Sequence, residues 1–328
     1  MKKQKKLIHE KNWDYLFILD ACRHDIFERV YGDYLSGKLS PVKSAGSATQ
    51  EWAINTFENK KMDDIVYVSG NPWFNSKFPM KDFDAREHFN AIIDVWDWGW
   101  NEDGTVRPIA LKKGLEIAEN NFPKKRKIIH FMQPHQPYLP LFEDNPSFSH
   151  KVLEYFFDFL KKIKSFSNKG ERTVSTAKNE KGNVSLRREF GDLLRNRFGK
   201  FNFFMFRKLL GLPPATIGEA FYRYGRPGLK KYYADNLKIA LEEVESIVNS
   251  LNGNIVISAD HGEFLGRPAS ENHNQKNTQD ILSDVKTFSA PDGSERILGH
   301  PYGAENDTLR KVPWLEIKND ESKKSRFF

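Results

Sequence analysis

The chain has 328 residues, of which 39% are hydrophobic and 29% are charged. This composition is that of an ordinary globular protein and excludes a chain that is disordered throughout. The formal net charge is +7, but residues 161–208 alone carry 14 Lys and Arg against 4 Asp and Glu, a net charge of +10. The basic character therefore belongs to one segment, which is either a solvated insertion or a contact surface for an anionic partner.

Cys22 is the single cysteine of the chain, so an intramolecular disulfide cannot form. The basic N-terminus is not followed by an apolar stretch of signal-peptide length. The strongest early apolar run, at residues 15–19, is too short to span a bilayer. From these features we expect a cytoplasmic protein in a reducing compartment.

The first predicted element in chain order is a buried strand at residues 14–21, a continuous apolar run that ends on Asp20. A helix follows it and is expected to end at Gly32. Beyond it the sequence predicts helices at 47–57, 109–121 and 231–253, and strands at 64–72, 127–135, 254–263 and 312–317. Strands that alternate with helices predict an α/β fold with a mainly parallel sheet and helices on both faces.

Polar residues with metal-binding chemistry stand at the ends of these predicted strands. Asp20 ends the first strand, Asp260 and His261 end a late one, and His300 precedes the last. In a parallel sheet, ligands bind where the carboxyl ends of the strands point. A lone strand-end Asp is more often a helix N-cap, but carboxylates and imidazoles gathered at one edge suit a divalent cation such as Zn²⁺ or Mn²⁺.

Five motifs carry a resemblance to a known superfamily. In chain order they are FILDACRHD, AGSATQEW, HFMQPHQPY, VISADHGE and GHPYG, the last of which precedes VPW. This order resembles the alkaline phosphatase and sulfatase superfamily, and it is most similar to the prokaryotic sulfatase-like hydrolases and transferases. The resemblance covers residues 14–140 and 226–317. It implies one alkaline phosphatase-like catalytic domain over residues 1–328, with 161–225 as a basic, aromatic-rich insertion.

The resemblance also implies a metal site. Asp20, Asp260 and His261 match the positions of metal ligands in the superfamily. Two-metal members carry a further Asp four residues before the position of His135, where this chain has Phe131. One divalent ion (Zn, Mn, Mg or Ca) is therefore expected.

A hydroxyl nucleophile is implied at the start of the helix that follows the first motif. Ser44, Ser47 and Thr49 lie near this turn. Ser47 directly follows Gly46 and is favoured, at the position where lipoteichoic acid synthases and phosphoethanolamine transferases carry Thr. Thr49 is the second candidate. Ser47 could equally act as a plain helix N-cap.

Two further histidines complete the predicted site. His135 and His300 are expected to contact the anionic oxygens of the substrate or its leaving group, and a purely structural role is the alternative for each. The sulfatase motif C/S-x-P-S-R, whose first residue becomes formylglycine, does not occur in this chain. A phosphate ester is therefore favoured over a sulfate ester.

The predicted activity is a metal-dependent hydrolase or transferase that acts on a phosphate-type ester, or on a sulfate ester, through a Ser or Thr nucleophile. Whether water or an alcohol accepts the group stays open. The alternative is a non-catalytic protein that retains the fold and binds an anion or a membrane.

The predicted partner is an anionic ester substrate, such as one linked to a lipid or a glycan. Residues 161–212 interleave basic with bulky apolar residues, a pattern typical of peripheral contact with an anionic membrane. A lid over the active site is the competing interpretation of this segment. Nucleic acid ranks third, because no recognised binding module accompanies the charge.

Overall fold

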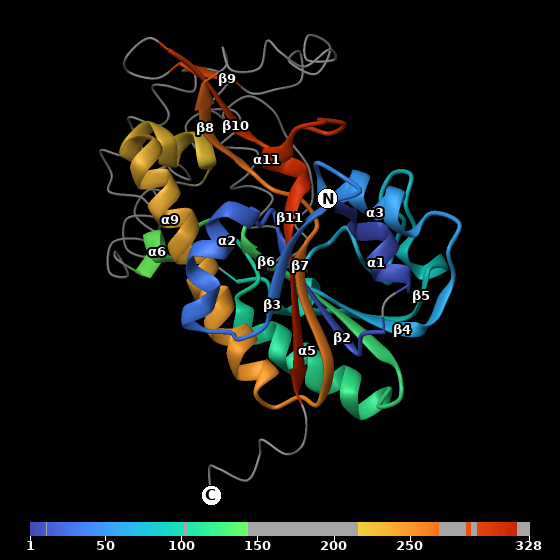
Figure 1. Cartoon of the computed structure of the whole chain (residues 1–328). Coiled ribbons are helices and arrows are strands. Elements are labelled where there is room, and N and C mark those ends of the chain that lie inside the picture. The colour runs from blue at the N-terminus through green and yellow to red at the C-terminus, as the bar shows by residue number, and fades with distance from the viewer. Residues whose placement is uncertain (11, 102–103, 144–215, 269–286, 290–293, 320–328) are drawn as a thin grey trace, which may run out of the picture.

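The computed structural model describes residues 1–10, 12–101, 104–143, 216–268, 287–289 and 294–319. An eight-stranded sheet forms the centre of the molecule, helices cover it, and a small three-stranded sheet lies beyond one edge (Figure 1). In spatial order the eight strands are β1 (Lys2–Lys3), β3 (Lys38–Lys43), β11 (Lys311–Asn319), β7 (Gly253–Ala259), β2 (Tyr15–Asp20), β6 (Arg126–Pro134), β4 (Met62–Ser69) and β5 (Phe89–Asp94). The small sheet contains β8 (Phe264–Pro268), β10 (Glu295–Gly299) and β9 (Thr287–Ser289).

The five neighbouring strands from β7 to β5 are parallel to one another. The predicted α/β fold with a mainly parallel sheet is therefore confirmed. β11 is the exception, because it pairs antiparallel with both β7 and β3. After β7 the chain builds the small sheet at the carboxyl end of the strands, so β11 starts from that end and must run back in the opposite direction.

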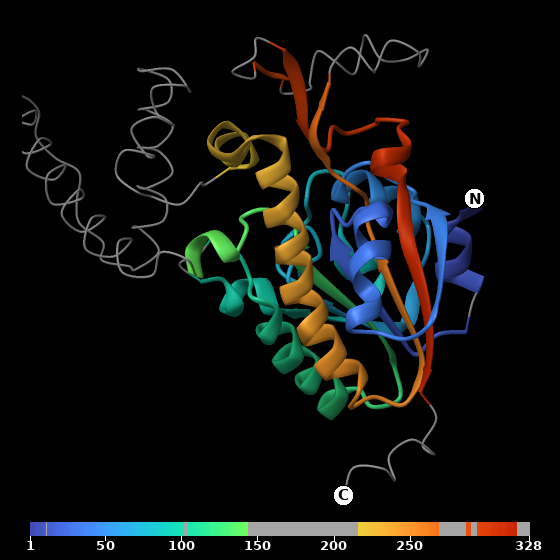
Figure 2. The same ribbon diagram turned by 60° about the vertical axis from the view of Figure 1, so that its left-hand side comes forward.

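Helices pack on both faces of the sheet. The helical segments are α1 (Gln4–Glu10), α2 (His24–Val30), η1 (Tyr31–Asp33), α3 (Thr49–Phe57), η2 (Ala85–Glu87), α4 (Val95–Gly99), α5 (Pro108–Asn121), α6 (Pro140–Glu143), α9 (Ile217–Val248) and α11 (Asp307–Arg310). Figure 2 shows α5 and α9 together on one side of the sheet. On the opposite side, the indole of Trp52 in α3 donates to Gln4 of α1, and the amide of Gln4 donates to Ser258 of β7 at 2.7 Å.

The strand at the centre of the sheet, β2, sets the position of the site. Its residues from Leu16 to Asp20 are buried, as the continuous apolar run predicts for a strand covered on both faces. Leu19 pairs with Ala259 of β7 on one side and with Phe131 of β6 on the other. The residues that follow these three strands therefore emerge side by side at one edge of the sheet.

Helix α9 differs most from its predicted bounds. It begins at Ile217 rather than at residue 231 and ends at Val248. It bends at Gly225, whose φ of 64° only glycine adopts readily, and Pro227 follows in the next turn. The Gly-Arg-Pro-Gly stretch therefore kinks the helix, and a helical turn continues on each side of it.

The basic segment predicted to contact a membrane, residues 161–212, lies outside the described residues. Of the longer insertion at 161–225, residues 216–225 are described, and they form the start of α9. Within the described part of the chain, no helix combines the length and the apolar character that a membrane span requires.

Candidate active site

Two carboxylates and one imidazole meet at the carboxyl ends of β2 and β7. Nε2 of His261 lies 3.7 Å from Oδ1 of Asp20 and 3.4 Å from Oδ2 of Asp260. One ligand atom from each of the three side chains lies within 4.8 Å of the others, and all three side chains are buried. The structure thus brings together the three residues that the sequence predicts as metal ligands, although 240 residues separate Asp20 from Asp260.

The chemistry of this trio fits a divalent cation. Oδ1 of Asp20 is buried and has no hydrogen-bond partner among the described residues. Nδ1 of His261 lies 2.8 Å from the carbonyl oxygen of Gly262, an acceptor that leaves the lone pair of Nε2 directed at the carboxylates. Burial and the nearby charge of Asp260 raise the pKa of Asp20, while burial lowers the pKa of His261. A cation at this point would offset the repulsion between two buried carboxylates.

Further contacts fix the two carboxylates. Oδ2 of Asp20 accepts a hydrogen bond from the side-chain amide of Asn71 at 2.8 Å. Oδ1 of Asp260 accepts from the backbone N–H groups of Ala21 and His261. Ala21 has a φ of 59°, a left-handed turn that is uncommon for a residue with a side chain. The sequence analysis missed Asn71, although its place at the end of the predicted strand 64–72 was the signal that could have found it.

Thr49 is the hydroxyl residue at this metal-ligand trio. It is the first residue of α3, and its Oγ1 donates to Oδ2 of Asp260 at 2.7 Å. The same oxygen lies 3.3 Å from Nε2 of His261. No side chain caps the amino end of α3, where Ala48 is the N-cap. The first-turn amides are thus left to an anionic group.

Ser47, the hydroxyl favoured from the sequence, is held in a different network. Its Oγ lies 2.8 Å from Oε2 of Glu51 and 2.7 Å from the carbonyl oxygen of Pro301, and it accepts from the N–H of Ala304. Arg310 donates to Oε1 of Glu51 at 2.6 Å. These buried contacts tie the loop before α3 to the loop that follows β10. The Ser44 hydroxyl donates to the backbone carbonyl of Asp260.

Glu51 and Arg310 are structural residues that the sequence analysis did not identify. Both side chains are buried, with exposed fractions of 8% and 7%. Gly46 makes the close approach of this loop possible, because a Cβ there would lie 2.2 Å from the backbone nitrogen of Trp52. The loop therefore has a fixed path into α3, which presents Thr49 and not Ser47 to the trio.

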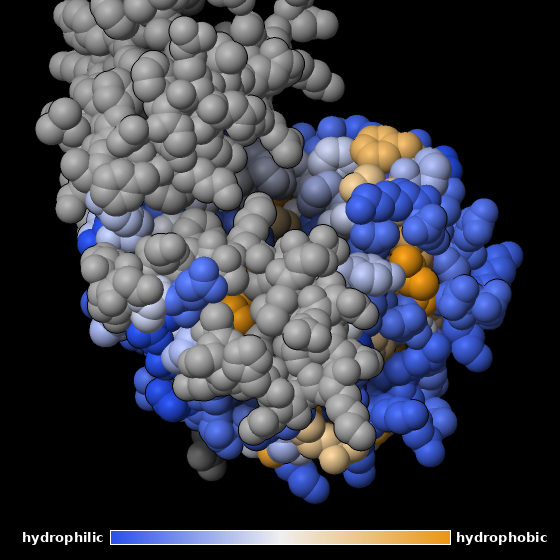
Figure 3. Space-filling model, turned by 90° about the horizontal axis from the view of Figure 1, so that it is seen from above, coloured by the Kyte–Doolittle hydropathy of each residue, from blue (hydrophilic) through white to orange (hydrophobic). Residues whose placement is uncertain are grey.

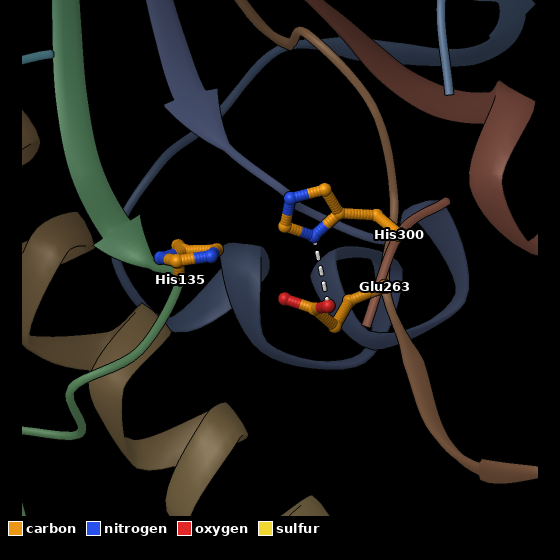
Figure 4. A group of neighbouring side chains, drawn as sticks. All are labelled: His135, Glu263 and His300. Atoms are coloured by element: carbon orange, nitrogen blue, oxygen red, sulfur yellow. Dashed lines mark hydrogen bonds and ion pairs between the residues drawn. The ribbon is translucent and has the colours of Figure 1, made fainter. Parts of the chain in front are cut away.

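A second group of side chains lies beside the first. Figure 4 shows His135, at the end of β6, facing His300 and Glu263. Nδ1 of His300 lies 3.0 Å from Oε1 of Glu263, and these three residues could also hold an ion. Burial lowers the pKa of His300, but the charge of Glu263 outweighs it, and the net shift is upward. The rings of His261 and His300 lie 4.3 Å apart, so the two groups form one continuous site.

Other side chains near the site take no part in the metal-ligand trio. Cys22 is buried. Asp25 forms a two-point ion pair with Arg23 and takes no part in the metal-ligand trio. Seen from the carboxyl ends of the strands, the described surface that is not overlain by grey atoms is mostly hydrophilic (Figure 3).

Comparison with solved structures finds similar folds at low sequence identity. The C-terminal periplasmic domain of phosphoethanolamine transferase EptC from Campylobacter jejuni is 14% identical, with a TM-score of 0.43 over 94% of this chain and 79% of that one. Lipooligosaccharide phosphoethanolamine transferase A (EptA) from Neisseria meningitidis is 12% identical, with a TM-score of 0.41 over 93% of this chain and 48% of that one. The zinc complex of the corresponding EptC domain from Escherichia coli is 11% identical, with a TM-score of 0.39 over 97% and 75%.

No protein-family model matches the sequence, and a search of curated proteins finds no match. The solved structures named above are an integral membrane phosphoethanolamine transferase and periplasmic domains of EptC proteins. The expected cytoplasmic location is corrected by the same finding, because the two EptC structures are periplasmic domains. The single cysteine and the lack of an apolar stretch of signal-peptide length were therefore insufficient grounds for that expectation.

Proposed function

We propose that the chain is a metal-dependent enzyme that transfers or hydrolyses a phosphate-type ester through Thr49. The observation that carries the proposal is the place of the Thr49 hydroxyl, 2.7 Å from Oδ2 of Asp260 and 3.3 Å from Nε2 of His261. A residue that only caps a helix needs no contact with two candidate metal ligands. A hydroxyl nucleophile does need a metal or a base beside it, because an alcohol is weakly reactive at neutral pH.

Asp20, Asp260 and His261 would hold the ion. When bound, a divalent cation supplies charge that stabilises an alkoxide and polarises a phosphoryl oxygen. The proton of the Thr49 hydroxyl points to Oδ2 of Asp260, its nearest acceptor. The amides at the amino end of α3, where Thr49 is the first residue, would stabilise the negative charge of the phosphoryl oxygens.

His300 and His135 are placed to assist the leaving group. Glu263 keeps His300 protonated to higher pH than an ordinary histidine, so His300 can donate a proton to the departing oxygen. In the first step the bond from Thr49 Oγ1 to phosphorus forms, and the bond from phosphorus to the leaving oxygen breaks. In the second step water or an alcohol attacks the same phosphorus and releases the Thr49 hydroxyl.

A turnover screen tests this proposal. The purified chain would be supplied in turn with Zn²⁺, Mn²⁺, Mg²⁺ and Ca²⁺, and assayed with p-nitrophenyl phosphate, bis(p-nitrophenyl) phosphate and p-nitrophenyl sulfate. Phosphatidylethanolamine belongs in the panel, because the similar structures are named for phosphoethanolamine transfer. We expect metal-dependent turnover of a phosphate ester, and a phosphoryl adduct on Thr49 by mass spectrometry after a rapid quench.

Thr56 offers a matched control for the nucleophile. Thr56 lies in the same helix as Thr49, is buried, and its hydroxyl has no hydrogen-bond partner among the described residues. Thr49→Val and Thr56→Val are the same nearly isosteric change. Loss of turnover in Thr49→Val alone supports the covalent mechanism. Equal turnover in both variants contradicts it, and metal binding without turnover of any ester favours the non-catalytic alternative.

A further inference from the structure

A polar pocket lies next to the candidate active site and is connected to it through Glu263. Its volume is about 320 Å³, and its lining includes Arg23, Arg226, Arg267, Leu265 and residues 306–308. These residues come from the start of α2, from α9, from β8 and from the start of α11, elements that meet above the carboxyl ends of the strands (Figure 1). A pocket of this size accommodates a small charged group together with part of the molecule that carries it.

Glu263 joins this pocket to the catalytic groups. Its carboxylate lies 3.0 Å from Nδ1 of His300, and its backbone carbonyl accepts from Nη1 of Arg23 at 3.3 Å. Leu265, which lies in β8 two residues after Glu263, lines the pocket. Glu263 therefore contacts His300 with its side chain and Arg23, which lines the pocket, with its backbone.

The charge of the pocket is positive. The two-point ion pair with Asp25 balances Arg23, and Asp307 contributes one further carboxylate to the lining. Arg226 is exposed and has no hydrogen bond or ion pair with any described residue. Burial lowers the pKa of neighbouring Lys230, and the charges of Arg226 and Arg23 lower it further. A cation close to this pocket is thus destabilised, as expected where positive charge accumulates.

We propose that this pocket binds a second, phosphate-type anionic group of the substrate, while the reacting ester lies at Thr49. The guanidinium of Arg226, which forms no ion pair with a described residue, supplies charge-assisted donors that suit the terminal oxygens of a phosphate monoester, and Arg267 lies in the same lining. The identification of the ligand as part of the substrate rests on the proposed function. The binding of the anion does not.

The test is direct binding to the full-length chain freed of metal by a chelator, so that no turnover is required. Inorganic phosphate is titrated into the protein in a calorimeter, and acetate is titrated in parallel. We expect phosphate to bind and acetate to bind more weakly. Arg226→Gln and Arg267→Gln should each weaken phosphate binding by about tenfold, the effect of losing one charge-assisted contact of ordinary strength.

Two control variants locate the bound anion. Arg86 is a surface arginine paired with Asp84 in a distant part of the fold, and Arg86→Gln should leave phosphate binding unchanged. His300→Gln removes the nearest competing anion site. Phosphate binding that resists both pocket variants and disappears in His300→Gln belongs to the histidines and overturns the proposal, as does a wild-type chain that binds no phosphate.

This result is separable from the proposed function. If phosphate binding depends on Arg226 or Arg267 but no ester is turned over, the pocket stands as an anion site and the enzymatic proposal fails. If esters are turned over through Thr49 while phosphate binding ignores both arginines, the enzymatic proposal stands and the pocket fails.

Discussion

Oγ1 of Thr49 lies 2.7 Å from Oδ2 of Asp260, although 211 residues separate the two in sequence. Ser47, two residues before Thr49, lies instead 2.8 Å from Glu51, four residues after it. The two hydroxyls on either side of Ala48 therefore have different surroundings: Thr49 lies beside Asp260 and His261, and Ser47 lies in the buried network of Glu51. This separation can be tested residue by residue.

Ser47→Ala should reduce stability more than it reduces activity. The substitution removes a buried hydroxyl that accepts from the N–H of Ala304 at 2.9 Å and leaves that donor without a partner. We expect the free energy of unfolding to fall by about 1–3 kcal/mol. Turnover, assayed well below the unfolding transition, should stay within about tenfold of wild type, a barrier change near 1.4 kcal/mol. A complete loss of turnover in folded Ser47→Ala would return the nucleophile to Ser47.

Removal of the metal should abolish turnover and lower the melting temperature. Without a cation the carboxylates of Asp20 and Asp260 are buried together, an unfavourable arrangement that a bound ion relieves. At an ion concentration about 100 times its Kd, the expected stabilisation is about 2.7 kcal/mol. Thermal unfolding with and without a chelator measures the effect, and an unchanged melting temperature in the presence of every candidate ion would contradict the site.

Asn71→Ala should weaken the metal site without removing a ligand. The Asn71 amide donates to Oδ2 of Asp20 and so orients that carboxylate. Loss of such an orienting contact typically weakens metal affinity by about 10–100-fold. The affinity can be followed by titration with Zn²⁺ and a competing chelator. As a control, Asn55→Ala removes an exposed amide that donates to the carbonyl of Ala45, and its affinity should equal that of wild type.

Glu51→Gln should be strongly destabilising. The side chains of Glu51 and Arg310 are both buried, so neutralising one leaves a buried charge with less compensation. We expect a loss of about 3 kcal/mol in the free energy of unfolding, measured with urea. Asp84→Asn breaks the partly exposed pair with Arg86 and should reduce stability by about 1 kcal/mol or less. Similar losses in the two variants would show that the Glu51–Arg310 pair has no special structural role.

His130 should make the metal-free protein sensitive to mild acid. Burial lowers its pKa to about 4, while the charge of Asp260 raises this pKa by a smaller amount and His261 lowers it further. Between about pH 6.5 and pH 4 the unfolded chain takes up a proton that folded His130 excludes, so stability falls as the pH falls. The expected loss from pH 7 to pH 5 is about 2 kcal/mol. Urea unfolding at both pH values should show a smaller loss in His130→Gln, and equal losses would contradict the assignment.

The grouping of Asp20, Asp260 and His261 could be predicted from sequence because each residue stands at the end of a clearly apolar strand. The strand before Asp20 is a continuous apolar run, and the strand before Asp260 is another. Parallel neighbours then deliver both carboxylates to one edge. The antiparallel direction of β11 could not be predicted in this way, because it depends on where the intervening small sheet leaves the chain.

Local sequence patterns could not predict which of Ser47 and Thr49 lies beside Asp260 and His261. Both residues precede the same helical pattern, and each has the chemistry of an N-cap. The outcome depends on the path of the loop, which Arg310 fixes through contacts with Ala45 and Glu51 from far along the chain. Contacts with so distant a residue leave no trace in the local sequence pattern.

The central place of β2 has a consequence for how the protein folds. β2 is the first long strand of the chain, yet one of its two partners, β7, begins at residue 253. Until that strand is available, β2 exposes an unpaired, apolar edge, which is the kind of edge that pairs with other chains. Completion of the sheet also requires contacts between residues far apart in sequence, a topology associated with slow folding. C-terminal truncation before β7 should therefore yield an aggregation-prone fragment, whereas loss of residues 320–328 should leave the sheet complete.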